Sequence, residues 1–216
     1  ASFLALKNIG LQLGSAMKNI ITSKDDVALF VRALFQNGAD SNGDYLAEKF
    51  LPPYKQKIVM NPVTRSAARV SLEIGTHSNI VYYSARSAYF DKIVEKAIYN
   101  GITQIVILGS GFDTRAYRFG KASPGVQFFE LDLPEAIVEK VKDVNALGLN
   151  ADNVEYLGMN LEEFPPKRVL EESDNFVQSK RTMFLMEGLS YRLSEDSVEV
   201  IFESIAEVAA PGSIFA

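Results

Sequence analysis

Cysteine is absent from this 216-residue sequence, and histidine occurs only once. Without cysteine, the protein has no disulfide framework, no thiolate metal site and no cysteine nucleophile. The sequence also lacks an apolar run of about 18 residues, which a transmembrane helix needs. Its first residues do not show the basic, apolar and small-residue order of a signal peptide. We therefore expect a soluble, cytoplasmic protein with no membrane partner.

The charge of the chain limits its partners further. The sequence holds 27 acidic and 22 basic residues, for a net charge of −5. Its lysines and arginines form no cluster of the kind that binds a phosphate backbone, so nucleic acid is not expected as a partner. With 47% hydrophobic residues, the chain is long enough for one well-packed domain and an additional segment.

One stretch near the middle of the chain has the pattern of a nucleoside-binding unit. Residues 104–108 form an apolar, β-branched run typical of a strand buried on both faces. The turn Gly109-Ser110-Gly111 follows, where glycine permits positive φ and close approach of a ligand to the backbone. After a predicted helix, an apolar run at 126–129 leads to Asp132, 21 positions beyond the second glycine. An acid at this spacing reaches the ribose hydroxyls of an adenine nucleoside.

Asp113 stands beside this turn and has two interpretations. It is a favoured residue at a helix N-cap, a position for which Thr114 is the other candidate. As a carboxylate next to the turn, it disfavours a phosphate group. It suits a positively charged ligand instead, such as the ammonium and sulfonium groups of S-adenosylmethionine.

The rest of the chain predicts an α/β fold. Helices are expected at residues 6–21, 24–37, 44–50, 54–60, 63–74, 81–100, 136–147 and 195–209, with a polar loop at 75–79. Further strands are expected at 154–157, 182–186 and 213–216. Strands separated by helices imply right-handed crossovers and a parallel sheet. Residues 1–81 are predicted to be a helical region that packs over this sheet domain.

Several predicted strands end on glycine or on a polar residue. These ends are Gly109, Asp132, Asn160-Leu161 and Glu187. Ligands of open parallel sheets bind outside the carboxyl ends of the strands. The sequence therefore predicts a binding site at this edge.

Four segments, in this order and spacing, resemble the leucine carboxyl methyltransferase family: YSARSAYFD, QIVILGSGFDTRAYRF, FFELDLP and MEGLSYRL. This family of S-adenosylmethionine-dependent O-methyltransferases includes the enzyme that methylates a phosphatase C-terminal leucine, bacterial relatives and polyketide-tailoring enzymes. The resemblance covers residues 82–216 and implies a Rossmann-like class I methyltransferase sheet, with residues 1–81 as an N-terminal helical lid. The family sheet continues beyond the fifth strand, so its C-terminal strands are expected to be missing here.

The resemblance implies a role for each matching residue. Arg86 would hold the carboxylate of the methionine moiety, and Glu187 would lie near its ammonium group. Asp132 would bind the ribose hydroxyls, and Asn160-Leu161 would lie beside the adenine, although the family usually has aspartate in place of asparagine. The residues predicted to bind the cofactor are Arg86, Gly109, Ser110, Gly111, Asp113, Asp132, Asn160, Leu161 and Glu187.

The expected reaction transfers a methyl group to an oxygen, with a carboxylate of a small-molecule or carrier-bound polyketide as the favoured acceptor. A carboxylate with a pKa of about 4 is ionised at pH 7 and needs no base. A hydroxyl acceptor would need one, for which Tyr191 and His77 are the substrate-side candidates. A protein C-terminal leucine is the alternative acceptor. An NAD-dependent oxidoreductase and a non-catalytic nucleoside-binding domain are the alternative classes, and the oligomeric state is left open.

Overall fold

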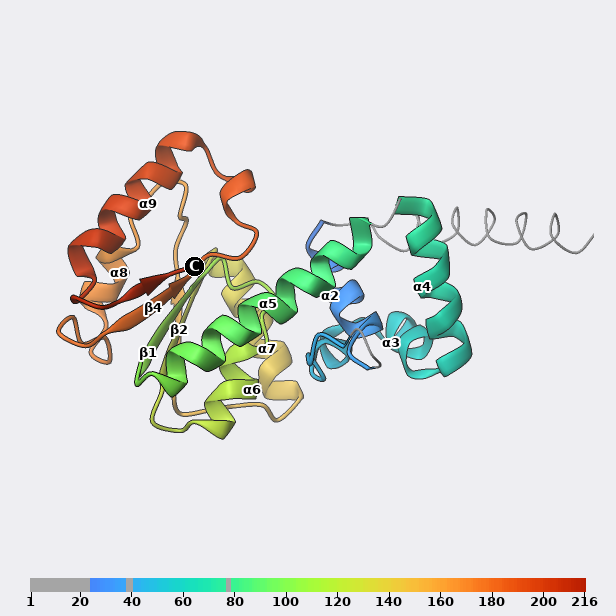
Figure 1. Ribbon diagram of the computed structural model, residues 1–216. Helices are drawn as coiled ribbons and strands as arrows, with labels where there is room; N and C mark the ends of the chain where they lie inside the picture. Colours follow the sequence, from blue (N-terminus) through green and yellow to red (C-terminus); the bar gives the residue numbers. More distant parts are fainter. Residues whose placement is uncertain (1–23, 38–40, 77–78) are drawn as a thin grey trace, which may run out of the picture. The chain divides into compact units, whose positions relative to one another are not determined.

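The computed structural model describes residues 24–37, 41–76 and 79–216 (Figure 1). The chain divides into two compact units, one that ends at Tyr89 and one that begins at Phe90. The predicted helix at 6–21 and His77 lie outside the described residues. Among the helices of the described ranges, none has the length and apolar character that crossing a membrane requires.

The described part of the N-terminal unit is helical. Its elements are α2 (Lys24–Leu34), the 3-10 helix η1 (Ala47–Phe50), α3 (Pro53–Met60), α4 (Pro62–Thr76) and the first part of α5 (Asn79–Tyr99). Proline opens both α3 and α4, because it has no N–H to leave unpaired at the first helical position. Between them, the Asn61 side chain accepts hydrogen bonds from the backbone N–H groups of Val63 (2.9 Å) and Thr64 (3.3 Å). Asn61 therefore both ends α3 and caps the start of α4.

Several boundaries in this unit differ from the sequence prediction. Helix α2 ends at Leu34 and does not extend to residue 37, and the Asn42 side chain donates to the Arg32 carbonyl in its last turn at 2.9 Å. Only Ala47–Phe50 of the predicted helix at 44–50 is helical, because Asp44 precedes it and accepts from the Ala47 N–H at 3.1 Å. Helix α4 continues to Thr76, through part of the predicted polar loop.

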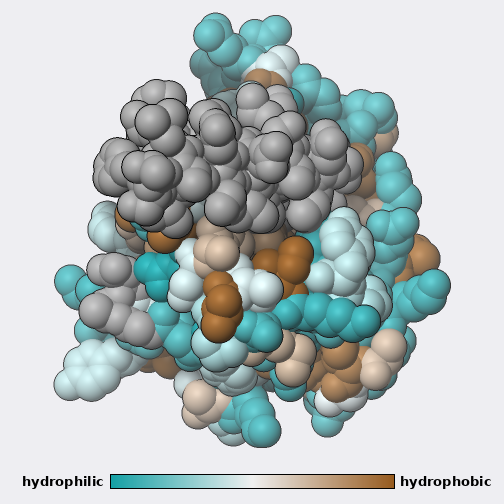
Figure 2. All heavy atoms as spheres, turned by 90° about the vertical axis from the view of Figure 1, so that its right-hand side faces the viewer, coloured by the Kyte–Doolittle hydropathy of each residue, from teal (hydrophilic) through white to brown (hydrophobic). Residues whose placement is uncertain are grey.

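Single hydrophobic residues remain exposed on the surface of this unit. Met60, Val63 and Val70 each have more than half of their surface accessible, at 64%, 77% and 54%. On the face of the molecule in Figure 2, hydrophobic residues are interspersed among hydrophilic ones. Scattered apolar side chains of this kind are normal on a protein surface and define no binding site by themselves.

The second unit is an α/β domain with a parallel sheet in the order β3-β2-β1-β4-β5. The strands are β1 (Gln104–Leu108), β2 (Gln127–Asp132), β3 (Val154–Gly158), β4 (Thr182–Leu185) and β5 (Ile214–Phe215). Their connections contain α6 (Arg115–Ala122), α7 (Pro134–Ala146), α8 (Lys167–Glu172), η2 (Ser190–Arg192) and α9 (Glu195–Val208). All five strands were predicted. Helix α8 was missed, because Leu170 is its one buried residue and gives no helical pattern.

Helices cover both faces of this sheet (Figure 1). On one face, apolar side chains of α5 and α6 pack against Ile105, Ile107 and Phe128. On the other face, α8 and α9 pack against Val106, Leu108 and Phe129. Strand β1 is buried on both faces, which explains its continuous apolar sequence.

The order of the strands creates a switch point at the centre of the sheet. From β1 the chain moves outward to β2 and β3, then returns to add β4 and β5 on the other side of β1. Right-handed crossovers therefore place the connecting helices on opposite faces. The loops that follow β1 and β4 diverge at this point, where open α/β sheets bind their ligands.

Candidate functional site

The turn after β1 contains two glycines with positive φ, 65° at Gly109 and 38° at Gly111. A Cβ built on Gly109 would lie 2.9 Å from Leu189 Cδ1, so a side chain of this protein occupies the space beside it. A Cβ built on Gly111 would meet no atom within 4 Å. Both glycines therefore have the positive φ that the sequence predicted, and Gly111 is the one of the two with open space beside it. That Gly109 binds the cofactor stays a prediction.

The end of β2 holds this turn in place. The Ser110 N–H donates to the Leu131 carbonyl at 3.0 Å, and the Gly111 N–H donates to Asp132 Oδ2 at 2.6 Å. The other carboxylate oxygen of Asp132 accepts from the Leu133 N–H at 2.8 Å. The acid and the turn are thus in contact, although they are far apart in the sequence. That Asp132 binds ribose hydroxyls stays a prediction.

Asp113 stabilises the start of α6. Its Oδ1 accepts from the Arg115 N–H at 2.7 Å, and its Oδ2 lies 2.6 Å from Arg115 Nη1. Thr114 is the N-cap residue by position, but its side chain makes no capping bond and instead accepts from Arg118 Nε at 2.9 Å. Asp113 therefore makes the hydrogen bond to the start of the helix, whereas Thr114 occupies the N-cap position. The carboxylate of Asp113 still lies beside the glycine turn.

Arg115 connects three elements of the site. Its side chain is 2% exposed and lies 2.7 Å from Asp91 of α5, 2.6 Å from Asp113 and 2.7 Å from Glu187 beyond β4. Burial alone would lower the pKa of Arg115, but the three carboxylates outweigh it and raise the pKa above its usual value. Arg115 therefore remains a cation at neutral pH.

Arg118 adds a second cation to this network. Its Nη1 and Nη2 donate to the two carboxylate oxygens of Asp91, at 2.5 Å and 3.0 Å. Asp91, Arg115 and Arg118 were not predicted as site residues. The available signal was their charge: each lies in a quoted motif, beside an apolar or aromatic residue of a predicted helix. Charged side chains are rarely buried unless they are paired, so these positions pointed to an ion network.

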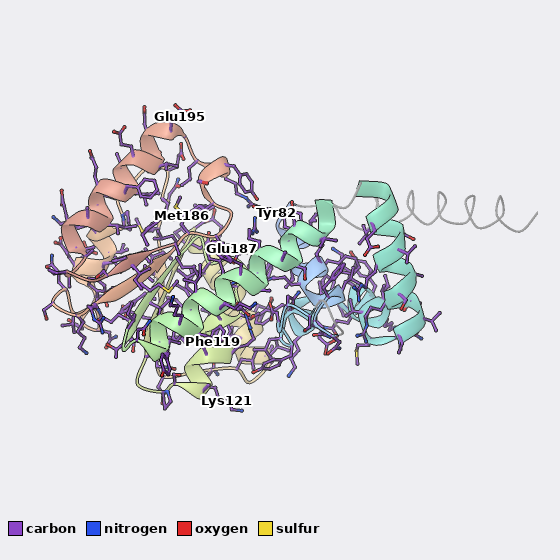
Figure 3. The ribbon with its side chains drawn as sticks, viewed as in Figure 1. Tyr82, Phe119, Lys121, Met186, Glu187 and Glu195 are labelled. Atoms are coloured by element: carbon purple, nitrogen blue, oxygen red, sulfur yellow. The ribbon has the colours of Figure 1, made fainter. Side chains whose placement is uncertain are left out.

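Glu187 reaches the site from the end of β4. The strand ends at Leu185, and Met186 and Glu187 follow it (Figure 3). The contact with Arg115 holds Glu187 on the same side as the turn after β1. Arg86 belongs to the N-terminal unit, where its guanidinium carbon lies 5.4 Å and 5.3 Å from the ring centres of Tyr82 and Tyr83. Its role towards a carboxylate stays a prediction.

The pair Asn160-Leu161 follows β3 at the same edge of the sheet. The Asn160 side chain is engaged locally, because it donates to Glu163 Oε1 at 2.9 Å and accepts from the Glu162 N–H at 3.0 Å. The Leu161 side chain is 7% exposed and belongs to the hydrophobic core on the α8 and α9 face. A contact with adenine would therefore use the Leu161 backbone, and both assignments stay predictions.

A polar cluster lies buried between β2, β3, α6 and α7. Glu130 Oε2 lies 2.7 Å from Lys140 Nζ and accepts from the Tyr117 hydroxyl at 3.2 Å, and Tyr117 in turn contacts the Tyr156 hydroxyl at 3.2 Å. Burial raises the pKa of Glu130 to about 7, although the Lys140 ammonium group opposes this shift. Burial and the Glu130 carboxylate also raise the pKa of Tyr117, so its hydroxyl stays protonated.

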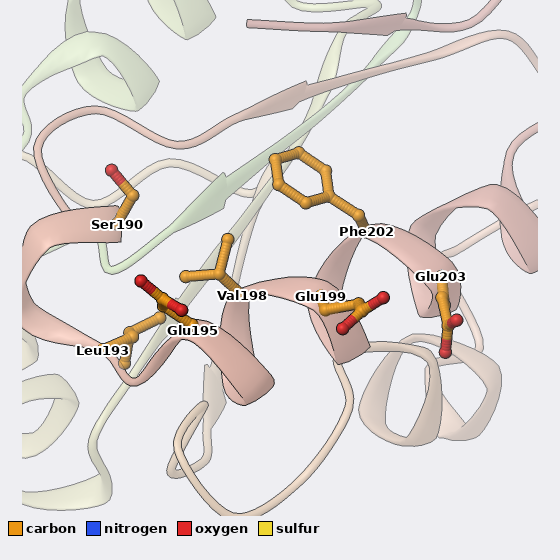
Figure 4. A pocket seen from close by; sticks show the side chains of 7 residues that line it. All are labelled: Ser190, Leu193, Glu195, Val198, Glu199, Phe202 and Glu203. Carbon is orange, nitrogen blue, oxygen red and sulfur yellow. The ribbon is translucent and has the colours of Figure 1, made fainter.

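Of the two substrate-side candidates, only Tyr191 lies in the part of the chain that the structure describes. Tyr191 is 61% exposed in η2, and His77 is outside the described residues. A cavity of about 460 Å³ lies between the η2 segment and α9 (Figure 4). It is lined by Ser190, Leu193, Glu195, Val198, Glu199, Phe202 and Glu203. None of the residues predicted to bind the cofactor lines this cavity.

The sheet order, the glycine turn after β1 and the acid after β2 define a Rossmann-like α/β domain. Residues 28–206 match the family model described as leucine carboxyl methyltransferase. The match covers most of the chain, and the chain therefore belongs to the leucine carboxyl methyltransferase family. This confirms the relationship that the four sequence motifs predicted.

Two relatives carry the name "Putative S-adenosyl-L-methionine-dependent methyltransferase". The one from Mycobacteroides abscessus is 38% identical over 135 residues, covering 62% of this chain and 44% of the relative. The one from Mycolicibacterium paratuberculosis is 26% identical over 205 residues, covering 90% of this chain and 65% of the relative. The chain therefore spans less than half the length of the first of these proteins and about two thirds of the second.

A solved structure supports the fold. The crystal structure described as "a putative methyltransferase from Thermobifida fusca" superposes with a TM-score of 0.52 at 20% identity. The superposition covers 87% of this chain and 64% of the other. At this level of identity, the likeness shows a shared fold and carries no statement about the reaction.

Proposed function

We propose that this protein is an S-adenosylmethionine-dependent O-methyltransferase, whose favoured acceptor is a carboxylate of a small-molecule or carrier-bound substrate. Membership of the family and the names of the relatives support the cofactor. One structural observation carries the proposal: carboxylates outnumber cations around the glycine turn.

The charges of the site favour a cationic nucleoside over a dinucleotide. Four carboxylates lie in or beside the turn and its ion network, on Asp91, Asp113, Asp132 and Glu187. Arg115 and Arg118 pair with three of these carboxylates, and the Lys140 ammonium group beside the turn pairs with a fifth carboxylate, on Glu130. The excess negative charge repels a pyrophosphate and attracts a ligand that carries ammonium and sulfonium groups.

The residues present fit such a cofactor. Gly111 leaves open space where a Cβ would stand, so a nucleoside can approach the backbone there. Asp132, in contact with this glycine, would accept from the ribose hydroxyls. Glu187, held in place by Arg115, would accept from the ammonium group, and Arg86 would pair with the carboxylate of the methionine moiety.

When bound, S-adenosylmethionine supplies a methyl group on a sulfonium, which is transferred in line to an oxygen of the acceptor. The protein's contribution is to position the two reactants, because the leaving group is already good. A carboxylate acceptor is ionised at neutral pH and needs no general base. A hydroxyl acceptor would need one, and Tyr191 is the exposed candidate among the described residues.

The class of acceptor is the finer part of the proposal. The mycobacterial relatives and the motif forms FDTRAYR and EGLSYRL support the bacterial branch of the family, which favours a small-molecule or carrier-bound polyketide over a protein C-terminus. A panel of small carboxylic acids, acyl-carrier substrates and leucine-terminated peptides, each assayed for methyl ester formation by the purified protein, separates these alternatives.

Isothermal titration with S-adenosylhomocysteine tests cofactor binding. We expect binding by the unmodified chain, loss of binding in Asp132→Ala, and unchanged binding in Asp152→Ala, an exposed aspartate in the loop before β3. Asp132→Asn keeps an acceptor for the Gly111 N–H but loses the charge, so it separates the anchoring of the turn from the binding of ribose. Binding of NAD with no binding of S-adenosylhomocysteine would contradict the proposal and favour the oxidoreductase class.

A further inference from the structure

Three consecutive residues of β2 hold the glycine turn. Leu131 accepts from the Ser110 N–H at 3.0 Å, and Asp132 accepts from the Gly111 N–H at 2.6 Å. The third residue, Glu130, acts through Lys140, whose Nζ lies 2.7 Å from Glu130 and 3.4 Å from the Ser110 carbonyl oxygen. The Ser110 carbonyl and the Gly111 N–H belong to one peptide group. The N–H is held by β2 directly, through Asp132, and the carbonyl is held indirectly, through the Lys140 ammonium group and Glu130.

We propose that Glu130 and Lys140 are positioning residues, which together set the orientation of the Ser110 carbonyl and hence of the Gly111 backbone that faces the nucleoside. This inference rests on the proposed function. Lys140 lies on α7 and Glu130 on β2, so the pair ties the turn to two elements behind it. Neither residue is among those predicted to bind the cofactor.

The burial of the pair supports a role beyond packing. The residues are 0% and 2% exposed, for Glu130 and Lys140 respectively. Taking two charges out of water costs more free energy than their attraction commonly returns, so two apolar side chains would stabilise the fold at least as well. An ammonium group, in contrast, donates in several directions at once and can bind a carboxylate and a backbone carbonyl together.

The surrounding polar atoms show a further cost of this arrangement. Among the described residues, Ser110 Oγ and Glu130 Oε1 are buried and have no hydrogen-bond partner. Unpaired buried polar groups are unfavourable, and they are retained where geometry at a site requires them. Ser110 and Glu130 are the two residues that Lys140 contacts. The unfavourable free energy of these unpaired atoms therefore arises at the contact that we propose to be functional.

Hydrogen exchange of the backbone amides tests the proposal without any ligand. Asp113 donates its N–H to the Ser110 carbonyl at 2.7 Å, so exchange in the peptide 109–114 reports the order of the turn. We expect Lys140→Met to speed exchange there by about tenfold, because the carbonyl loses its second anchor. Lys142→Met, an exposed lysine on the same helix, is the matched control and should leave this exchange unchanged.

A double variant separates positioning from simple charge burial. Lys140→Met leaves Glu130 without its cation, and this alone destabilises the fold. In Glu130→Gln with Lys140→Met, no charge remains unpaired, so thermal stability should return towards that of the unmodified chain while exchange at 109–114 stays fast. Return of both properties together, or unchanged exchange in folded Lys140→Met, would overturn the proposal.

Titration with S-adenosylhomocysteine links the turn to binding. We expect the double variant to bind about tenfold more weakly than the unmodified chain, since small displacements of a site reduce its function strongly. Affinity equal to that of the unmodified chain would overturn the proposal. If the unmodified chain itself does not bind, the proposed function fails, and the exchange experiment still decides whether the pair positions the turn.

Discussion

Arg115 Nη1 lies 2.7 Å from Glu187 Oε2, and this contact joins the start of α6 to the end of β4 across the switch point of the sheet. The two residues are 72 positions apart in the sequence, and each follows a strand of the sheet at its carboxyl end. The contact joins the segments that follow β1 and β4. It also means that the carboxylate proposed for the ammonium group depends on a buried cation for its position.

Replacement of Arg115 should destabilise the whole domain. Arg115→Met would leave the carboxylates of Asp91, Asp113 and Glu187 with one buried cation fewer, and breaking such a network costs about 3–5 kcal/mol of unfolding free energy. Urea denaturation followed by circular dichroism measures this loss. Arg168→Met is the control, because that side chain is 59% exposed and its loss should change stability by less than ~0.5 kcal/mol. Equal stability of the two variants would show that the Arg115 network is not structural.

The glycines allow the space for a ligand to be tested apart from backbone strain. Gly111→Ala and Gly148→Ala both place a Cβ on a residue with positive φ, 38° and 63°, and neither Cβ meets an atom within 4 Å. Each variant should lose ~1 kcal/mol of stability through strain. Only Gly111→Ala should also weaken the binding of S-adenosylhomocysteine, by about tenfold or more, because its methyl group stands where the nucleoside approaches. Isothermal titration and thermal denaturation of both variants give the comparison, and full affinity in Gly111→Ala would place the ligand elsewhere.

The pKa of Glu130 predicts a pH-dependent stability. Burial raises this pKa to about 7, from an ordinary value of 4.5, against the opposing effect of Lys140. The folded state therefore holds the proton more tightly than the unfolded chain, and the resulting stabilisation is complete below pH 4.5 and is lost as the pH rises through about 7. Three other ionisable side chains face this carboxyl: Tyr117, Tyr156 and Asp113. Burial raises the pKa of both tyrosines, so neither hydroxyl titrates between pH 4.5 and 7.

The measurement compares the unmodified chain with Glu130→Gln. The unfolding free energy of the unmodified chain, minus that of the variant, should fall by ~3 kcal/mol between acidic and neutral pH, as the shift of the pKa of Glu130 implies. Urea denaturation at several pH values gives this difference, and groups common to both proteins cancel. A difference that rises with pH would mean that Lys140 dominates and holds the pKa of Glu130 below its ordinary value.

Ser194 should contribute to the stability of α9. It is the N-cap residue, and its Oγ accepts from the Ser197 N–H at 3.2 Å. Ser194→Ala removes this bond and should cost ~1 kcal/mol of unfolding free energy, while Ser194→Thr keeps an acceptor and should cost much less. Denaturant titration of both variants checks the difference. Equal losses would show that the side-chain oxygen does not cap the helix.

Local sequence patterns were sufficient for most elements of the sheet domain. The run QIVIL predicted β1 with its observed bounds, because four consecutive apolar residues, three of them β-branched, fit a strand buried on both faces. Ser194 before an apolar periodic segment predicted the start of α9. The same approach missed α8, whose short polar sequence gives no helical pattern, although Leu170 packs in the core beside α9.

The site itself was only partly predictable. The spacing from the glycine turn to Asp132 predicted that these residues approach each other, since strand, helix and strand of known length bring them to one edge of a parallel sheet. The sequence did not show that Leu189 fills the space beside Gly109, or that Asp91, Arg115 and Arg118 form one network. These contacts join residues from separate loops and helices.

By itself, then, the sequence determined the alternation of strands and helices, the glycine turn and the family, because each of these depends on residues that are close together or regularly spaced. The tertiary structure decided which charges neutralise one another and which glycine stays open. Those outcomes depend on distances between side chains of β2, β4, α5, α6 and α7, and only the packing of the parallel sheet with its helices sets these distances.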